Sequence, residues 1–325
     1  MVNSCLKDCR IVFMGTPEFA VASLQALVEA GGNVAAVVTS PDRPAGRGLQ
    51  LQLSSVKRYA LEQSIPVLQP EKLRNEAFLN SLQQLDADLF VVVAFRMLPE
   101  VVWRMPRLGT FNLHASLLPR YRGAAPISWA IINGETETGV TTFFIDENID
   151  TGKILLSEKV KISPADTAGT LHDRLMDVGK RLALKTVEGI VSGCIQPVAQ
   201  EAVCSDEVPV APKLFKDTCR ISWQKRGGEL VNFIRGLSPC PAAWCELVAD
   251  GAAPQQAKIF AAHAELSTSE RLPQPGALLT DGRSFLKAAC ADGFLCIDEL
   301  QPAGKKRMKT EEFLRGARGI FKTWR

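Results

Sequence analysis

Several features that this 325-residue sequence lacks narrow what the protein can be. None of its nine cysteines forms a Cys-x-x-Cys pair, and its only three histidines lie far from them in the chain, which is a poor pattern for a zinc site. The longest apolar runs are too short to cross a bilayer, and the polar N-terminus does not resemble a signal peptide. An odd number of cysteines then indicates reduced thiols in a cytoplasmic protein.

A strong charge excess is also absent. The formal net charge of +3 is too small to identify a nucleic-acid-binding protein by itself. The hydrophobic content of 46% and the charged content of 22% are ordinary for a soluble globular protein. At this length we expect two domains with a sizeable core.

The first two-thirds of the chain alternates predicted strands and helices. A helix is expected to begin at Thr16-Pro-Glu18, and a long helix over residues 167–191 closes the region. This pattern predicts an α/β domain with an open, mostly parallel, Rossmann-like sheet, in which ligands bind beyond the carboxyl ends of the strands. The glycine pattern of a dinucleotide loop is missing after Gly15. The predicted strands cover residues 10–14, 33–39, 88–94, 110–114, 141–146 and 154–162.

The composition changes from about residue 194. Residues 194–213 are rich in proline and polar side chains, so we read them as a linker. Short strands with turn signals follow, and they predict a smaller, OB-like β-barrel domain over residues 214–325. Residues 1–193 would then form the catalytic domain. The predicted elements of the second domain are strands over 220–223, 243–248, 257–261 and around Asp292-Gly293, and helices over 228–235 and 310–322.

Two polar residues stand at the end of one predicted strand. Asn112 and His114 are two positions apart, so their side chains should lie on the same side of the sheet. An amide can donate to a developing oxyanion, and an imidazole can take the proton of an attacking amine. For an isolated Asn-x-His pair the alternative, two buried polar residues bonded to the backbone, is the better explanation.

The neighbouring segments favour chemistry over packing. Residues 116–126 form a long irregular turn at the same sheet edge. An acidic loop, Asp146–Gly152, follows the next predicted strand, and a carboxylate in it could orient His114 or raise its basicity. Three polar segments at one edge predict an acyl-transfer site.

At these positions the chain resembles the tetrahydrofolate-dependent formyltransferases. The resemblance is carried by Asn112-Leu-His-Ala-Ser-Leu-Leu-Pro119 and by Asp146–Gly152. It implies 10-formyltetrahydrofolate as the formyl donor, no metal, and Asn112, His114 and Asp150 as the catalytic residues. It also implies folate contacts from Ser116, Leu117, Leu118, Pro119, Phe95, Met97, Leu98 and Asp146.

Other segments resemble the members of this family that act on methionyl-tRNA. They are Gly15–Phe19, Pro41–Gly48, Arg120–Ile127 and Gln301–Lys306, and they extend the resemblance over nearly the whole chain. The implied acceptor is the α-amine of methionine on initiator tRNA, and we expect a monomer with no membrane association. Alternatives are an amino-sugar nucleotide acceptor, hydrolysis of formyl-folate, or a non-catalytic RNA-binding protein. A basic second domain argues against the first two, and the complete catalytic trio argues against the third.

Basic residues in two places are expected to contact the tRNA. Arg43 and Arg47 lie in a long glycine-rich loop, for which a solvated loop is the alternative. Lys305 and Lys306 begin a basic C-terminal cluster that could neutralise phosphates, against the alternative of a solvated helix face. The rest of that cluster is Arg307, Lys309, Arg315, Arg318, Lys322 and Arg325, against only Glu311 and Glu312.

The chain departs from the family pattern in two loops. Phe95-Arg-Met-Leu98 stands where the family usually has Tyr-Gly, in the loop expected to contact the pterin. Leu49 and Gln50 stand where two lysines are frequent, which weakens the expected positive charge of the Arg43 loop.

Overall fold

A computed structural model of the chain describes residues 4–45, 50–202, 208–249, 253–269, 271–316 and 321–324. It divides the chain into two compact units. Unit 1 contains Met1–Gly123, Glu137–Lys161 and His172–Val210, and unit 2 contains Ala124–Thr136, Ile162–Leu171 and Ala211–Arg325. The division at 1–193, 194–213 and 214–325 remains a prediction, and residues 194–210 of the expected linker are part of unit 1.

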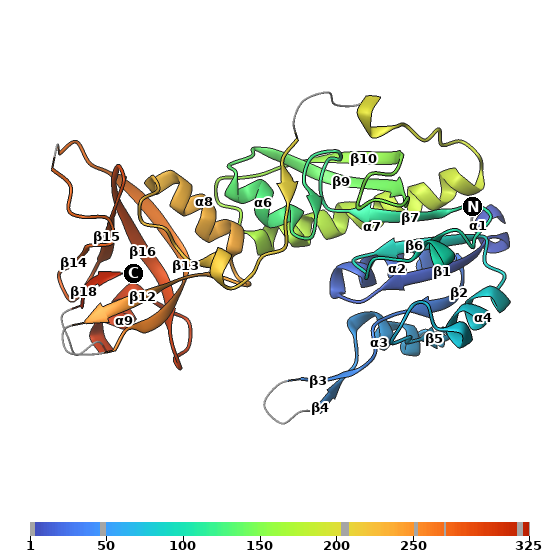
Figure 1. Ribbon diagram of the computed structural model, residues 1–325, viewed down its shortest axis with the longest axis horizontal. Helices are drawn as coiled ribbons and strands as arrows, with labels where there is room; N and C mark the ends of the chain where they lie inside the picture. The colour runs from blue at the N-terminus through green and yellow to red at the C-terminus, as the bar shows by residue number, and fades with distance from the viewer. Residues whose placement is uncertain are drawn as a thin grey trace. The chain divides into compact units, whose positions relative to one another are not determined.

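A seven-stranded sheet forms the centre of unit 1 (Figure 1). Five neighbouring strands pair in parallel, and the two pairings at one edge, β7 with β9 and β9 with β10, are antiparallel, so the predicted Rossmann-like α/β fold is confirmed. In spatial order the strands are β10 (Ile154–Lys161), β9 (Glu137–Phe144), β7 (Thr110–His114), β6 (Leu89–Val93), β1 (Arg10–Gly15), β2 (Asn33–Val38) and β5 (Val67–Leu68).

The central strands are apolar on both faces because both faces are covered. All five residues of β6 are buried, as a strand in the middle of a parallel sheet requires. On one face Val92 belongs to a core cluster with Phe78 of α4 (Glu76–Gln84) and Val102 of α5 (Glu100–Trp103). The other described elements of unit 1 are α1 (Ser4–Asp8), α2 (Glu18–Glu29), α3 (Ser55–Glu62), β3 (Arg43–Ala45), β4 (Gln50–Gln52), β8 (Arg122–Gly123) and the 3-10 helix η1 (Gln200–Ala202).

Helix α7 (Ala168–Val191) determines on which side of the sheet each β7 side chain lies. A Cβ added to Gly179 would lie 3.0 Å from Leu113 Cδ2, so the helix backbone and Leu113 are in close contact. Thr186 Oγ1 lies 2.8 Å from Thr142 Oγ1 of β9. Because Leu113 faces α7, its neighbours Asn112 and His114 face the opposite side of the sheet.

Unit 2 is built on a curled antiparallel sheet with its own core. The two end strands of the sheet approach each other. The backbone N–H of Trp324, in β18 at one end, donates a hydrogen bond of 2.8 Å to the carbonyl of Gly276, which lies two residues before β14 at the other end. The predicted smaller β-barrel is confirmed. Its strands run in the order β14 (Leu278–Thr280), β15 (Leu286–Cys290), β16 (Gly293–Pro302), β13 (Gln255–Leu266), β12 (Ala243–Ala249) and β18 (Phe321–Trp324), with β17 (Met308–Lys309) paired to β16.

Helices and short elements complete unit 2. Helix α6 (Pro126–Ile132) packs against α8 (Gly227–Leu237), where a Cβ on Gly236 would lie 3.0 Å from the Ser128 carbonyl oxygen. The remaining elements are η2 (Asp217–Cys219), α9 (Thr310–Gly316) and β11 (Val210–Ala211), whose first residue belongs to unit 1.

Two expectations for this unit are wrong. Residues 220–223 form no strand, since only Arg220 makes an isolated bridge, to Trp244. The helix predicted to reach residue 322 ends at Gly316, and Phe321–Trp324 pair with β12 as a strand. Local helix signals are overridden there because Trp324 is buried in the barrel core.

Trp324 should therefore be needed for the stability of unit 2. It is 2% exposed and its ring lies 5.9 Å from that of Trp223. We expect Trp324→Ala to lower the free energy of unfolding by about 3–5 kcal/mol, because it opens a cavity in the core. Urea titration followed by circular dichroism measures this. The exposed β13 variant Gln255→Ala is the control, and equal stability of the two variants would contradict the prediction.

Candidate active site

Asn112 occupies the middle of β7, beside Val92 of β6 and Phe143 of β9. The residue is half-buried, and its Oδ1 atom is inaccessible to solvent. Within the part of the chain that the structure describes, no group hydrogen-bonds to this oxygen. An unsatisfied buried amide oxygen is costly, so this atom is the one expected to meet a substrate.

His114 is the last residue of β7 and is 6% exposed. Its Nε2 lies 2.8 Å from the carbonyl oxygen of Tyr121. A carbonyl only accepts hydrogen bonds, so Nε2 carries a proton and, in the neutral ring, Nδ1 carries the free electron pair. Nδ1 is the nitrogen that faces Asp150, at 3.7 Å from Oδ2. That separation is too long for a direct hydrogen bond.

Asp150 lies in a loop between β9 and β10 and has a left-handed backbone, with φ of 57°. Its side chain is 13% exposed, and Oδ2 accepts a hydrogen bond of 2.9 Å from the backbone N–H of Gly123. A non-glycine residue in this conformation is strained and is retained only where surrounding contacts enforce it. These contacts hold the Asp150 carboxylate beside Nδ1 of His114.

Asp146 shapes the same loop. Its Oδ1 accepts hydrogen bonds from the N–H of Asn148 at 3.0 Å and from Thr151 Oγ1 at 2.7 Å. This is an Asx-type turn, which leads the chain into Asp150. A folate contact by Asp146 remains a prediction.

The segment Tyr121–Gly123 connects the two catalytic candidates. The carbonyl of Tyr121 holds His114, and the N–H of Gly123 holds Asp150. Tyr121 is itself left-handed, with φ of 60°, and its own N–H donates to the Pro209 carbonyl at 2.6 Å. The irregular turn expected from the sequence is thus the element that sets the spacing between His114 and Asp150.

The four residues after β7 that were expected to contact folate are mostly turned inward. Ser116 is 0% exposed, and its Oγ donates to the Arg120 carbonyl. Leu118 packs in a cluster with Phe143, Pro119 is buried, and only Leu117 is half-buried. The contact of these residues with folate stays a prediction.

The loop after β6 combines buried and exposed residues. Leu98 is 7% exposed within the core, Phe95 is half-buried against it, and Met97 is 77% exposed. The Arg96 guanidinium donates to the carbonyls of Pro70 and Glu71. Desolvation and, secondarily, the charge of Arg43 lower the pKa of Arg96. Arg96 therefore holds two loops together, and the predicted folate contacts of Phe95, Met97 and Leu98 remain untested.

Arg43 begins the β3–β4 hairpin and is exposed, whereas Arg47 lies outside the described residues. A polar network holds the base of this hairpin: Lys57 Nζ bonds Asp42 Oδ2 at 2.5 Å and Gln69 Oε1 at 2.6 Å. Hydrogen bonds from Lys57 and Gln69 lower the pKa of Asp42. The hairpin is therefore presented from a fixed base.

The basic cluster near the C-terminus is partly neutralised. Lys305 is exposed, but Lys306 Nζ lies 3.3 Å from Glu312, and Arg307 is paired with Glu299 at 2.5 Å. The pairing with Glu299 was not foreseen, because that residue lies on β16, outside the basic stretch. Arg318 and Arg325 lie outside the described residues.

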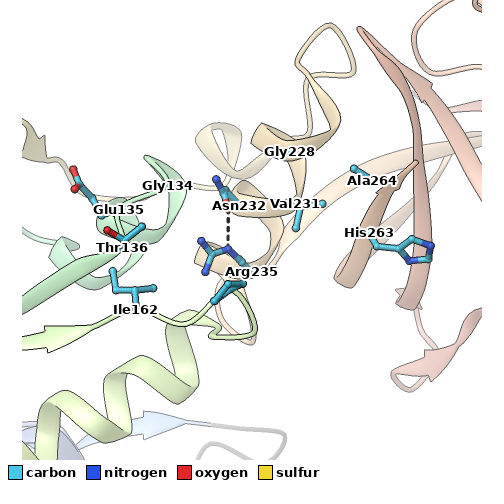
Figure 2. Close-up of a pocket in the computed structure, with 11 residues that line it drawn as sticks. Gly134, Glu135, Thr136, Ile162, Gly228, Val231, Asn232, Arg235, His263 and Ala264 are labelled. Carbon is cyan, nitrogen blue, oxygen red and sulfur yellow. Dashed lines mark hydrogen bonds between the residues drawn. The ribbon is translucent and has the colours of Figure 1, made fainter. Parts of the chain in front are cut away.

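The two cavities described in the structure are distinct from this site. The larger, of about 440 Å³, lies in unit 2, where Asn232 and Arg235 project from α8 and are hydrogen-bonded at 2.9 Å (Figure 2). The second, of about 370 Å³, lies in unit 1 between Trp103 and Ile145. Neither is lined by Asn112, His114 or Asp150.

The described residues have neither a metal-ligand cluster nor a membrane-spanning helix. They contain no group of three or more His, Cys, Asp or Glu placed to hold a metal ion. In the same part of the chain, no helix has both the length and the apolar character needed to cross a membrane.

Comparison with known proteins identifies the family. The formyl transferase family model matches residues 9–187, and the model of the formyl transferase C-terminal domain matches residues 213–318. The chain belongs to the formyl transferase family. It is 55% identical to a methionyl-tRNA formyltransferase of Bacteroides thetaiotaomicron, over 96% of this chain and 97% of that protein. A relative of the same name from Flavobacterium johnsoniae is 50% identical, over 96% and 97% of the two chains.

Solved structures share the fold at low identity. A sugar 3N-formyl transferase, WlaRD, solved with dTDP and 5-N-formyl-THF, has a TM-score of 0.63 and 21% identity, over 92% of this chain and 99% of that one. HypX from Aquifex aeolicus, in complex with tetrahydrofolic acid, has a TM-score of 0.60 and 19% identity, over 97% and 51% of the two chains.

Three contributors to the candidate site were missed from the sequence. They are the carbonyl of Tyr121, the N–H of Gly123 and the side chain of Gln200, which bonds the Asp150 loop. Two are backbone groups, which no residue type reveals. Gln200 lies in the segment that we read as a linker, so its burial was not expected.

Gly152 should be irreplaceable in the Asp150 loop. A Cβ at this position would lie 1.6 Å from the Phe144 carbonyl oxygen, so the backbone would have to move. We expect Gly152→Ala to lower the kcat of formyl transfer about 100-fold or more, because small displacements of catalytic groups are that costly. Gly228→Ala, where the added Cβ meets no atom within 4 Å, is the control. Near-native turnover in Gly152→Ala would contradict the loop geometry.

Proposed function

We propose that the protein transfers the formyl group of 10-formyltetrahydrofolate to the α-amine of methionine esterified to initiator tRNA, for translation initiation. The acceptor is supported by the 50–55% identity to methionyl-tRNA formyltransferases along nearly the whole chain. The observation that carries the chemistry is the unpartnered amide oxygen of Asn112 on the same face of β7 as His114, whose ring lies beside Asp150.

The reaction needs two changes of bonding and one proton transfer. The amine nitrogen forms a bond to the formyl carbon, and the bond between that carbon and the donor nitrogen breaks. One proton leaves the amine, and one reaches the released donor nitrogen. In between, the formyl oxygen carries negative charge, which preorganised hydrogen-bond donors stabilise.

Each catalytic candidate has a group suited to one of these needs. The Asn112 amide can donate to the formyl oxygen through Nδ2 and accept an amine hydrogen at Oδ1. His114 can take the amine proton at Nδ1 or donate to the oxyanion once it is protonated. Asp150 stabilises the protonated ring across the 3.7 Å gap, directly or through water.

A folate donor is supported by the family and by two fold neighbours whose structures contain 5-N-formyl-THF or tetrahydrofolic acid. The 10-formyl form is part of our proposal. So are donor contacts along residues 116–119, at Phe95, Met97 and Leu98, and at Asp146. The buried, unpaired Oδ1 of Asn112 fits a site that is completed by a polar substrate.

The tRNA contacts are proposed on charge and exposure. Arg43 projects from an anchored hairpin, and Arg47 follows it in the sequence. Lys305 is exposed, and Lys306 forms an ion pair with Glu312 at the surface. Such side chains can bind phosphates. We further propose that the enzyme acts as a monomer in the cytoplasm, without metal.

An amino-sugar nucleotide acceptor is the competing activity, because a sugar formyltransferase shares the fold. That likeness is at 21% identity, and the methionyl-tRNA relatives are at 50% or above. The test is formyl transfer from labelled 10-formyltetrahydrofolate, comparing methionyl-tRNA with uncharged tRNA, free methionine and an amino-sugar nucleotide. We expect product only with methionyl-tRNA. Labelled formate without an acceptor would instead indicate a hydrolase.

The trio should be required for this reaction. We expect Asn112→Ala, His114→Ala and Asp150→Ala each to lower kcat by about 10²–10³-fold, because each removes a group that acts on charge or a proton in the transition state. Single-turnover transfer to methionyl-tRNA measures this, with circular dichroism to confirm folding. Near-native turnover in His114→Ala would refute the proposed chemistry.

A further inference from the structure

We propose that Gln200 is a positioning residue that holds Asp150 in place through the backbone of the loop at residues 146–152. The catalytic role of Asp150 rests on the proposed function. The hydrogen bonds that connect Gln200 to this loop and to Arg122, which we call the bracket, do not depend on that function. Gln200 lies in η1 and is separated from Asp150 by 50 residues of sequence.

Every hydrogen-bonding position of the Gln200 side chain is used. Its Nε2 donates to the carbonyls of Asp150 at 2.9 Å and Gly152 at 2.8 Å. Its Oε1 accepts from Nε of Arg122 at 3.0 Å and from Nη2 of Arg122 at 2.6 Å. The residue is 1% exposed, so these bonds are made in a dry environment, where an amide that is not fully paired would be unfavourable.

The Asp150 loop depends on such support. Ile149 at its tip is 62% exposed, so little apolar packing holds the tip. Asp150 has the left-handed backbone that surrounding contacts must enforce. Gln200 bonds the carbonyls on both sides of Thr151, whereas Gly123 bonds the Asp150 carboxylate.

Arg122 connects Gln200 to the chain segment that holds His114. It lies between Tyr121, whose carbonyl holds the His114 ring, and Gly123. Gln200 thus links the loop that carries Asp150 to the segment that holds His114. The separation between Nδ1 and Oδ2 is the quantity that this bracket fixes.

Gln200 is not needed to anchor its own segment. Val198 and Ile154 already exchange two backbone hydrogen bonds, each of 2.8 Å, two residues before it. The side chain therefore adds a connection to the active-site loop rather than a second attachment of η1.

The bracket is tested first in the free protein. Gln200→Met removes all four hydrogen bonds at similar volume, and Gln196→Met makes the same change at an exposed position of the same segment. Amide hydrogen exchange should become faster in peptides covering residues 146–152 in Gln200→Met only. Should Gln200→Met fail to fold, Gln200→Asn, which is too short to reach both carbonyls, takes its place. Unchanged exchange in a folded variant overturns the proposal.

The catalytic consequence is tested by kinetics. We expect Gln200→Met to lower kcat about 10–100-fold with little change in the KM for methionyl-tRNA, because alignment is lost and binding is not. In an Asp150→Ala background the same change should have no further effect, since Gln200 acts through Asp150. A fully additive loss, or a raised KM at normal kcat, overturns the positioning role. An inactive wild-type protein would refute the proposed function, and the exchange result would still decide on the bracket.

Discussion

The candidate site depends on three consecutive residues, Tyr121–Gly123, that bond both catalytic candidates. Tyr121 binds the His114 ring through its carbonyl, Arg122 binds Gln200, and Gly123 binds the Asp150 carboxylate through its N–H. Because the groups are successive on one chain segment, they cannot shift independently. The sheet supplies the position of His114, and this segment supplies its orientation and the distance to Asp150.

The sheet explains why Asn112 joins them. Strand β7 lies between the parallel β6 and the antiparallel β9, and α7 packs against Leu113. That contact turns Asn112 and His114 toward the opposite face. An amide with an unpaired buried oxygen, a histidine with a defined tautomer and a nearby carboxylate together match the needs of amine formylation, and the family supplies the donor class.

Much of the fold could be predicted from the sequence. Continuously apolar strands such as β6, and the two-residue period of Asn112 and His114, are local patterns that a sequence records directly. Asp150 was predicted as a catalytic residue only from the family resemblance, because no local pattern indicates that its loop returns to the end of β7. Gln200 could not be foreseen, since a polar residue in a proline-rich stretch is typical of a linker and its three partner residues lie 48–78 positions away. Strand β18 was missed because its stability comes from pairing with β12 rather than from local propensity.

The orientation of His114 is the central claim, and nitrogen NMR tests it most directly. In 15N-labelled protein the two ring nitrogens of a neutral histidine have well-separated chemical shifts, and the low-field one lacks the proton. We predict that the neutral His114 ring is protonated at Nε2 and unprotonated at Nδ1, because the Tyr121 carbonyl holds the Nε2 proton. A proton found on Nδ1, or a ring that populates both tautomers equally, would contradict this account.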